Sequence, residues 1–182
     1  MNTIYKSHNE SFSVKKRAGR GTSLLFLFLL SLLPLHAQTS PKHEVRAAWI
    51  TAVYGLDWPR TKATTPAGIR RQKEELIDIL DRLKEANFNT VLFQTRTRGD
   101  VLYRSDIEPF NSILTGKTGG DPGYDPLAFA IEECHKRGME CHAWMATFAF
   151  GGKKQVAALG KQSVTKRERD ICVPYKNEYF LN

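Results

Sequence analysis

Three short apolar segments, separated by two amphipathic ones, constrain the fold of this chain more than any other feature. The apolar segments are Val45 to Val53, Thr90 to Thr95 and Glu140 to Ala146, and each is rich in strand-forming residues. Strands that alternate with helices form a parallel sheet with right-handed crossovers. The pattern therefore predicts an α/β protein, and both an open doubly wound sheet and an eight-stranded barrel fit it.

Two helices are predicted between these strands. The first begins at Pro66, with Thr65 as N-cap, and its apolar residues recur at helical spacing as far as Glu85. The second begins at Pro126 and ends before Gly138. No glycine-rich phosphate-binding motif follows the first strand, which disfavours nucleotide binding.

Two long stretches lack such periodicity. Residues 97–125 form a long loop, and loops of that length in compact domains are usually functional or mobile. Residues 151–169 are polar and basic, and we expect them to be solvated surface without a closing element. Inside the first strand, Trp49 fits a core residue better than a ligand contact.

The N-terminus has the pattern of a secretory signal peptide. The apolar run from Leu24 to Leu35 follows four basic residues, and Ala37 offers a cleavage site before Gln38. We therefore expect residues 1–37 to be a signal peptide and residues 38–182 to be exported to the periplasm or medium. The run is short for a spanning helix, so an uncleaved membrane anchor is the alternative. Membrane contact is then expected only through this segment during export.

Charge and cysteine usage exclude several classes of partner. The net charge is +8, but residues 1–37 hold five basic residues and one acidic residue, which leaves +4 beyond them. No groove of spaced aromatic and basic residues indicates nucleic acid binding. The three cysteines, Cys134, Cys141 and Cys172, lack zinc spacing. We expect Cys134 and Cys141 to be buried thiols, with no metal and no cofactor.

Five stretches of the chain resemble the glycosyl hydrolase-like family 10 barrels of exported bacterial proteins. They are VRAAWITAVYGLDWP at 45–59, FNTVLFQTRTRGDVLYRSDIEPF at 88–110, LTG at 114–116, DPGYDPLAFAIEECHKRGMECHAW at 121–144 and YFLN at 179–182. The resemblance is specific, because order, spacing and composition agree across three strand–helix units.

The resemblance implies a (β/α)8 TIM barrel that acts on glycans, with cell-wall polymers as the leading substrates of some members. The expected fold is thus the first three βα units of a TIM barrel, truncated, with residues 38–182 as the N-terminal part of the barrel. Later family strands, including one with a His, a Phe and paired Asp residues, have no counterpart here. Met145 to Phe150 also replaces the usual Asn-Pro-Tyr-Arg-like continuation.

Active sites of such barrels lie at the C-terminal ends of the strands, where aromatic rings can stack on sugar faces and polar groups can bond hydroxyls. Eight residues are therefore the candidate substrate contacts: Asp57, Trp58, Gln94, Arg96, Asp100, Tyr103, His142 and Trp144. Each of four has a second interpretation. Trp58 could anchor its loop, Gln94 and Arg96 could serve internal hydrogen bonding, and Asp100 could pair with Arg96 or Arg98.

Glycoside hydrolysis ordinarily needs two carboxyl groups, roughly 5 to 10 Å apart. Asp57 and Asp100 are the only acids predicted near the mouth, and spacing does not show that they face each other, so no catalytic acid is assigned. The expected function is the N-terminal part of an exported glycoside hydrolase acting on polysaccharide or peptidoglycan-type glycan. A glycan-binding module without catalysis and an inactive truncated product are the alternatives.

Overall fold

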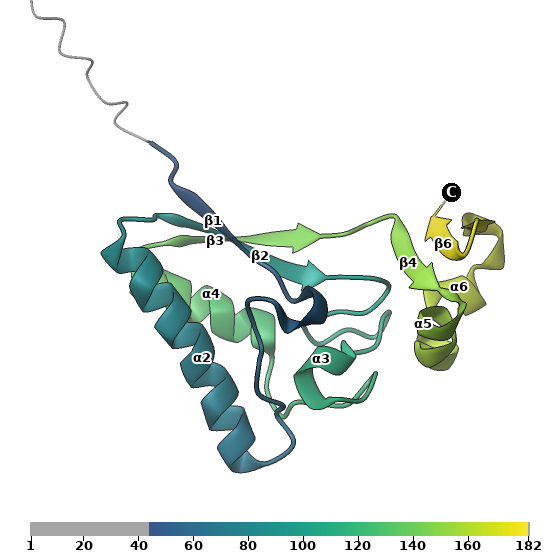
Figure 1. Ribbon diagram of the computed structural model, residues 1–182, viewed down its shortest axis with the longest axis horizontal. Helices are drawn as coiled ribbons and strands as arrows, with labels where there is room; N and C mark the ends of the chain where they lie inside the picture. Colours follow the sequence, from purple (N-terminus) through teal and green to yellow (C-terminus); the bar gives the residue numbers. More distant parts are fainter. Residues whose placement is uncertain (1–43, 182) are drawn as a thin grey trace, which may run out of the picture. The chain divides into compact units, whose positions relative to one another are not determined.

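A computed structural model of the protein describes residues 44–181 (Figure 1). The expected signal peptide, residues 1–37, and its cleavage site before Gln38 lie outside the described residues. Among residues 44–181, no helix is both long and apolar enough to cross a membrane.

A three-stranded parallel sheet forms the first part of the described chain. Its strands are β1 (Ala47–Ile50), β2 (Thr90–Arg96) and β3 (Glu140–Met145), in the order β1-β2-β3. Trp49 pairs with Leu92, and Leu92 pairs with His142, so these three side chains share one face. The prediction of an α/β protein with a parallel sheet is confirmed.

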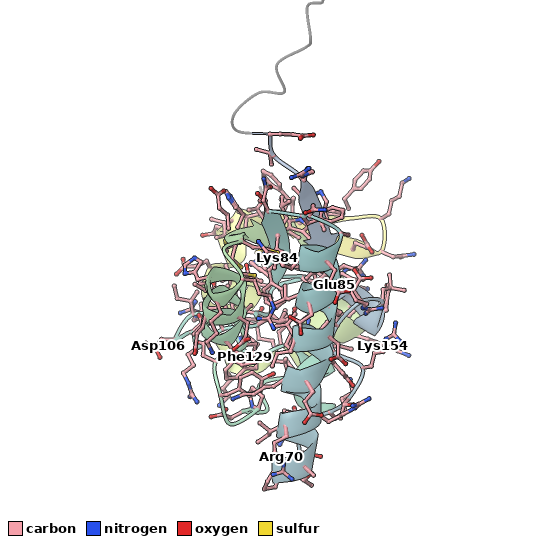
Figure 2. The ribbon with its side chains drawn as sticks, turned by 90° about the vertical axis from the view of Figure 1, so that its left-hand side faces the viewer. Arg70, Lys84, Glu85, Asp106, Phe129 and Lys154 are labelled. Atoms are coloured by element: carbon pink, nitrogen blue, oxygen red, sulfur yellow. The ribbon has the colours of Figure 1, made fainter. Side chains whose placement is uncertain are left out.

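Helices α2 (Pro66–Glu85) and α4 (Pro126–Lys136) connect these strands, as the sequence predicts. The Thr65 hydroxyl accepts a hydrogen bond from the Gly68 amide at 3.1 Å, which satisfies a free N–H of the first turn of α2. Gly138, with φ +64°, ends the second helical segment. Figure 2 shows α2 along its length, with Arg70 near its start, Lys84 and Glu85 near its end, and Phe129 of α4 beside it.

Both helices cover the same face of the sheet (Figure 1). The core between them contains Leu76 and Leu80 of α2, Ala130 of α4, and Val91 and Phe93 of β2. Their burial removes apolar surface from water at about 25 cal/mol per Å² and is the main stabilisation of this layer.

The opposite face of the sheet is not covered by any helix of the described chain. Trp49 is 59% exposed there, and its ring meets that of Trp144 edge to face at 4.7 Å between centroids. The expectation that Trp49 is a core residue is therefore wrong. The prediction failed because the sequence of a strand does not show which of its two faces the helices will cover.

The long loop after β2 is folded rather than extended. It contains α3 (Ser112–Thr115), and isolated bridges join Arg96 to Val101 and Val101 to Phe110. The side chains of Val101, Leu102 and Leu114 are completely buried. The loop therefore packs as an ordered layer beyond the C-terminal ends of β1 and β2.

The stretch after Phe150, expected to be solvated surface without a closing element, is mostly exposed or half-buried, but it forms regular elements that the sequence did not indicate. The chain forms β4 (Ala149–Gly152), α5 (Lys153–Ala158), η2 (Gly160–Gln162), α6 (Val164–Arg167), η3 (Arg169–Ile171), β5 (Cys172–Tyr175) and β6 (Glu178–Leu181). The strands make an antiparallel sheet in the order β4-β6-β5. Elements of three to six residues are too short to show a hydrophobic period.

The two cysteines expected to be buried thiols lie where α4 packs on β3. Cys134 is completely buried and Cys141 is half-buried against the same core. A hydrogen bond with Cys141, together with burial, raises the pKa of the Cys134 thiol. Within residues 44–181, no cluster of His, Cys, Asp or Glu side chains has the arrangement of a metal site.

Candidate functional site

A pocket of about 260 Å³ lies at the C-terminal edge of β1 and β2. Ligands of parallel α/β sheets bind at this edge. The loop after β1 contributes Tyr54, the loop after β2 contributes Arg98 and Asp100, and α5 contributes Gln155. The volume lies just below the range of roughly 300–1,000 Å³ for ligand pockets, which suits one small unit.

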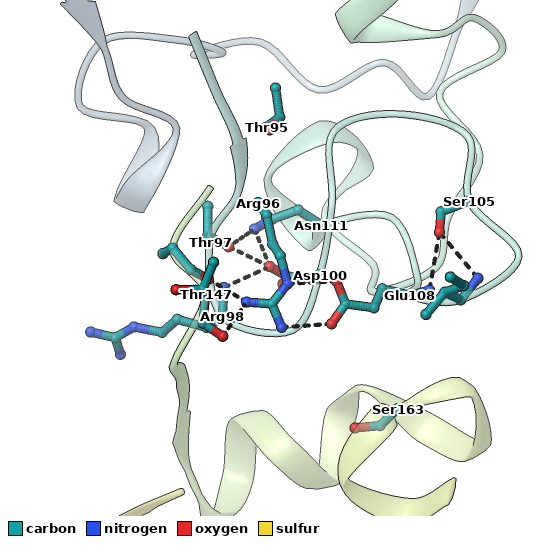
Figure 3. Close-up of polar contacts among 12 residues, drawn as sticks. Thr95, Arg96, Thr97, Arg98, Asp100, Ser105, Glu108, Asn111, Thr147 and Ser163 are labelled. Carbon is teal, nitrogen blue, oxygen red and sulfur yellow. Dashed lines mark hydrogen bonds and ion pairs between the residues drawn. The ribbon is translucent and has the colours of Figure 1, made fainter. Parts of the chain in front are cut away.

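Asp100 is the one carboxylate that lines this pocket among the described residues. Its Oδ1 accepts hydrogen bonds from the Thr97 hydroxyl, from Asn111 Nδ2 at 2.9 Å and from the Arg98 amide at 3.3 Å (Figure 3). Its Oδ2 accepts none from the part of the chain that the structure describes. The expected alternative, an ion pair with Arg96 or Arg98, does not form there. One oxygen is thus fixed and the other remains available.

Gln94 holds the loop that lines the other side of the pocket. Its side chain is almost completely buried, and Oε1 accepts hydrogen bonds from the Thr51 hydroxyl at 2.7 Å and from the amides of Ala52 and Val53 at 2.8 and 3.2 Å. These bonds fix the start of η1 (Val53–Gly55), which presents Tyr54 at φ +55° and 77% exposed. Internal hydrogen bonding, the second interpretation of Gln94, is what the structure shows.

Arg96 is also occupied within the chain. Its Nε and Nη2 donate to the two carboxylate oxygens of Glu108 at 2.6 Å each, and Nη1 donates to the carbonyls of Ala146 and Thr147 (Figure 3). The guanidinium lies 5.1 Å from the centre of the Phe150 ring. Arg96 therefore joins the loop after β2 to the segment that leads into β4. The geometry makes it a positioning residue, and a direct sugar contact stays a prediction.

Trp58 lies in the core and not at the pocket. It is completely buried, its indole Nε1 donates to the Gln72 carbonyl at 2.8 Å, and its ring packs against Phe93. A residue with no exposed surface cannot stack on a sugar, so its predicted role as a substrate contact is corrected to that of a loop anchor.

Asp57 and Tyr103 also lie away from the pocket lining. Asp57 accepts a hydrogen bond from the Thr51 amide at 2.8 Å and lines a second hollow, of about 370 Å³, between β1 and α2. Tyr103 is half-buried. Burial is the main cause that raises the pKa of its hydroxyl, and the negative charge of the nearby Glu108 is the second. Asp57 and Asp100 therefore line different cavities, and they do not form a facing pair.

His142 and Trp144 lie on the uncovered face of the sheet. His142 Nε2 is 2.9 Å from Glu140 Oε2, and both side chains are exposed. Trp144 is paired with Trp49. Neither His142 nor Trp144 lines the pocket, so of the eight candidates only Asp100 belongs to the pocket lining.

Sequence reasoning missed Asn111 and Gln155 as pocket residues. Asn111 caps α3 through its Oδ1, which accepts from the Ile113 amide at 2.7 Å, while its Nδ2 fixes Asp100. An Asn before a short helical stretch is a capping signal that could have indicated this position. Gln155 lies in a segment expected to be plain surface, and no sequence signal points to it.

Comparison with known proteins bears on what such a pocket can do. Residues 44–177 match the protein family described as glycosyl hydrolase-like 10. The chain belongs to this family. The match to the glycosyl hydrolase-like 10 family spans the first sheet, the elements from β4 to β5 and every residue of the pocket lining, and it ends before β6.

Two curated relatives agree with the glycosyl hydrolase-like 10 assignment. The chain is 35% identical over 156 residues to the glycosyl hydrolase YngK of Bacillus subtilis. The matching region covers 85% of this chain and 30% of that protein. It is 42% identical over 104 residues to the glycosyl hydrolase DigH of Escherichia coli K12. That matching region covers 55% of this chain and 24% of that protein. The chain thus spans less than a third of the length of either relative.

Proposed function

We propose that this chain contributes the first three βα units of a (β/α)8 barrel to an exported glycoside hydrolase, and that the pocket binds one sugar of its glycan. Three parallel strands with both helices on one face are the arrangement that such a barrel would continue. The uncovered face would become the barrel interior, and the loops beyond β1 and β2 would line the active-site end. Peptidoglycan-type glycan is the leading substrate class.

The geometry of Asp100 carries this proposal. Three donors hold Oδ1, so the carboxylate is fixed before a ligand arrives and loses little conformational freedom on binding. Oδ2 can then accept a sugar hydroxyl, and Arg98 in the same pocket can donate to a neighbouring oxygen. The exposed Tyr54 ring offers an apolar surface for a sugar face.

The described residues supply one carboxylate for this pocket where hydrolysis ordinarily needs two. Asp57 lines the other hollow, and both carboxylate oxygens of Glu108 accept hydrogen bonds from Arg96. We therefore propose that a partner carboxyl group comes from protein beyond these residues, and that the chain by itself binds glycan without cleaving it. Zymography on peptidoglycan and plant glycans tests this, since a cleared zone would show a complete enzyme.

Binding by the pocket is tested with Asp100→Asn. Losing a hydrogen bond to a charged group costs about 1.5–3 kcal/mol, so the affinity for peptidoglycan oligosaccharides should fall about tenfold or more. Asp106→Asn is the matched control, because Asp106 is exposed in the same loop and makes no ion pair among residues 44–181. Equal affinities of the two variants, measured by calorimetry, would remove the pocket from the proposal.

A further inference from the structure

Arg98 is a charged residue without a counter-charge in the part of the chain that the structure describes. Its side chain is half-buried and lines the pocket, yet its guanidinium makes no ion pair or hydrogen bond with the described atoms of residues 44–181 (Figure 3). Arg96, two residues earlier, is saturated by Glu108 and two carbonyls. The neighbouring Asp100 turns Oδ1 toward Thr97 and Asn111, not toward the Arg98 side chain.

The surface beside Arg98 is positively charged. A side chain at Gly151 would meet the stem of Arg98 at 3.3 Å, so Arg98 runs along the end of β4. Lys153 and Lys154 follow directly and are both exposed. Residues 149–181 hold seven basic and three acidic residues, whereas residues 44–148 hold fourteen basic and fifteen acidic ones. The positive excess of the described chain is thus concentrated in the segment that closes the pocket.

We infer that the pocket takes an acidic saccharide, with a sugar carboxylate bound by Arg98 and further anionic groups along α5. This inference rests on the glycan-binding role proposed above and specifies its substrate class. A guanidinium binds a carboxylate through two parallel N–H bonds, a geometry that a hydroxyl cannot match. Asp100 Oδ2 would accept a hydrogen bond from a hydroxyl of the same sugar. The Arg98 guanidinium and the Asp100 carboxylate would then each contact a complementary group of the ligand.

Calorimetric titration with soluble peptidoglycan glycan strands, freed of stem peptides so that the lactyl carboxylates of the sugars are free, tests the inference with the full chain. Two preparations are compared, one with its carboxylates intact and one in which carbodiimide coupling has converted them into amides. Arg98→Gln removes the proposed partner, and Arg98→Lys keeps the charge without the paired N–H geometry. Arg70→Gln is the control, because Arg70 is exposed on α2 and outside the pocket (Figure 2). Thermal unfolding confirms that each variant is folded.

The expected result is an affinity of the parent chain about tenfold higher for the intact preparation, with a strong decrease at high salt. Arg98→Gln should lose that preference, Arg98→Lys should keep part of it, and Arg70→Gln should keep all of it. Equal binding of both preparations by the parent chain would overturn the inference and leave the proposed function in place. If the parent chain binds neither preparation, both the inference about acidic saccharides and the proposed glycan-binding function are overturned.

Discussion

At the scale of single residues, β2 shows how polar side chains inside a strand organise the loops around a pocket. Gln94 fixes the loop after β1, and Arg96 fixes two segments through Glu108 and through main-chain carbonyls. The sequence marks both residues as unusual, because polar side chains inside a strand need partners. It does not show that the partners are internal, since Glu108 lies in a loop without periodicity.

Gln94→Leu should destabilise the protein. The substitution removes the acceptor of the buried Ala52 amide and of the half-buried Thr51 hydroxyl, and each such loss costs about 1–3 kcal/mol. We expect the free energy of unfolding to fall by about 2 to 4 kcal/mol in urea titrations. Gln155→Leu is the comparison, because the exposed Gln155 accepts a single hydrogen bond within the described part of the chain, from the Gly152 amide. Equal losses for the two variants would contradict the role given to Gln94.

The buried pair of Arg96 and Glu108 should show strong coupling. Both side chains are 8% exposed, so Glu108→Gln leaves a buried guanidinium without its counter-charge. We expect a loss of about 3–5 kcal/mol in the free energy of unfolding. The double variant Arg96→Met with Glu108→Leu should lose less than Glu108→Gln, because no unpaired charge remains. A double variant with the summed loss of its single variants would show that the pair is not coupled.

At the scale of elements, helical spacing and capping residues predicted α2 and α4, and apolar segments rich in strand-forming residues predicted β1, β2 and β3. These signals work because each element is long enough to repeat its pattern. The short elements between Ala149 and Leu181 give no such signal, and the hairpin between β5 and β6 turns on Lys176 at φ +55° rather than on a Gly. The sequence therefore predicted the first sheet and missed the second.

An ion-pair network at the end of α4 makes the protein sensitive to acid. Hydrogen bonds from Lys136 and Arg137 lower the pKa of Glu133 from its ordinary value of 4.5, and Arg137 also bonds Asp81 of α2 at 2.6 Å. A lowered folded-state pKa means stability that is present above pH 4.5 and lost as pH falls through the folded value. Glu133→Gln should therefore flatten the loss of melting temperature between pH 6 and pH 3. An unchanged slope would contradict this.

At the scale of the whole molecule, the described chain has an open sheet face and two open strand edges, on β1 and β3. Parallel sheets are usually covered on both faces, and open edges invite pairing with other chains. We propose that the remainder of a barrel covers this face. The chain alone should then be marginally stable and should associate as its concentration rises, which size-exclusion chromatography would show. A monomer with a cooperative transition at all concentrations would contradict it.

Export is also a property of the whole chain. The proposed signal peptide predicts that protein recovered from the periplasm or medium begins at Gln38, because the basic stretch and short apolar run are read by the secretion machinery. Intact-mass analysis measures this directly. A mature protein that still begins at Met1 would refute cleavage and favour the uncleaved anchor.

We propose above that the pocket at the C-terminal edge of β1 and β2 binds glycan. The most direct measurement is a titration of the isotope-labelled chain with peptidoglycan oligosaccharides, followed by NMR amide shifts. We expect saturable shifts centred on four residues of the pocket lining, Tyr54, Arg98, Asp100 and Asn111. Shifts confined to the hollow between β1 and α2, or the absence of any saturable shift, would contradict it.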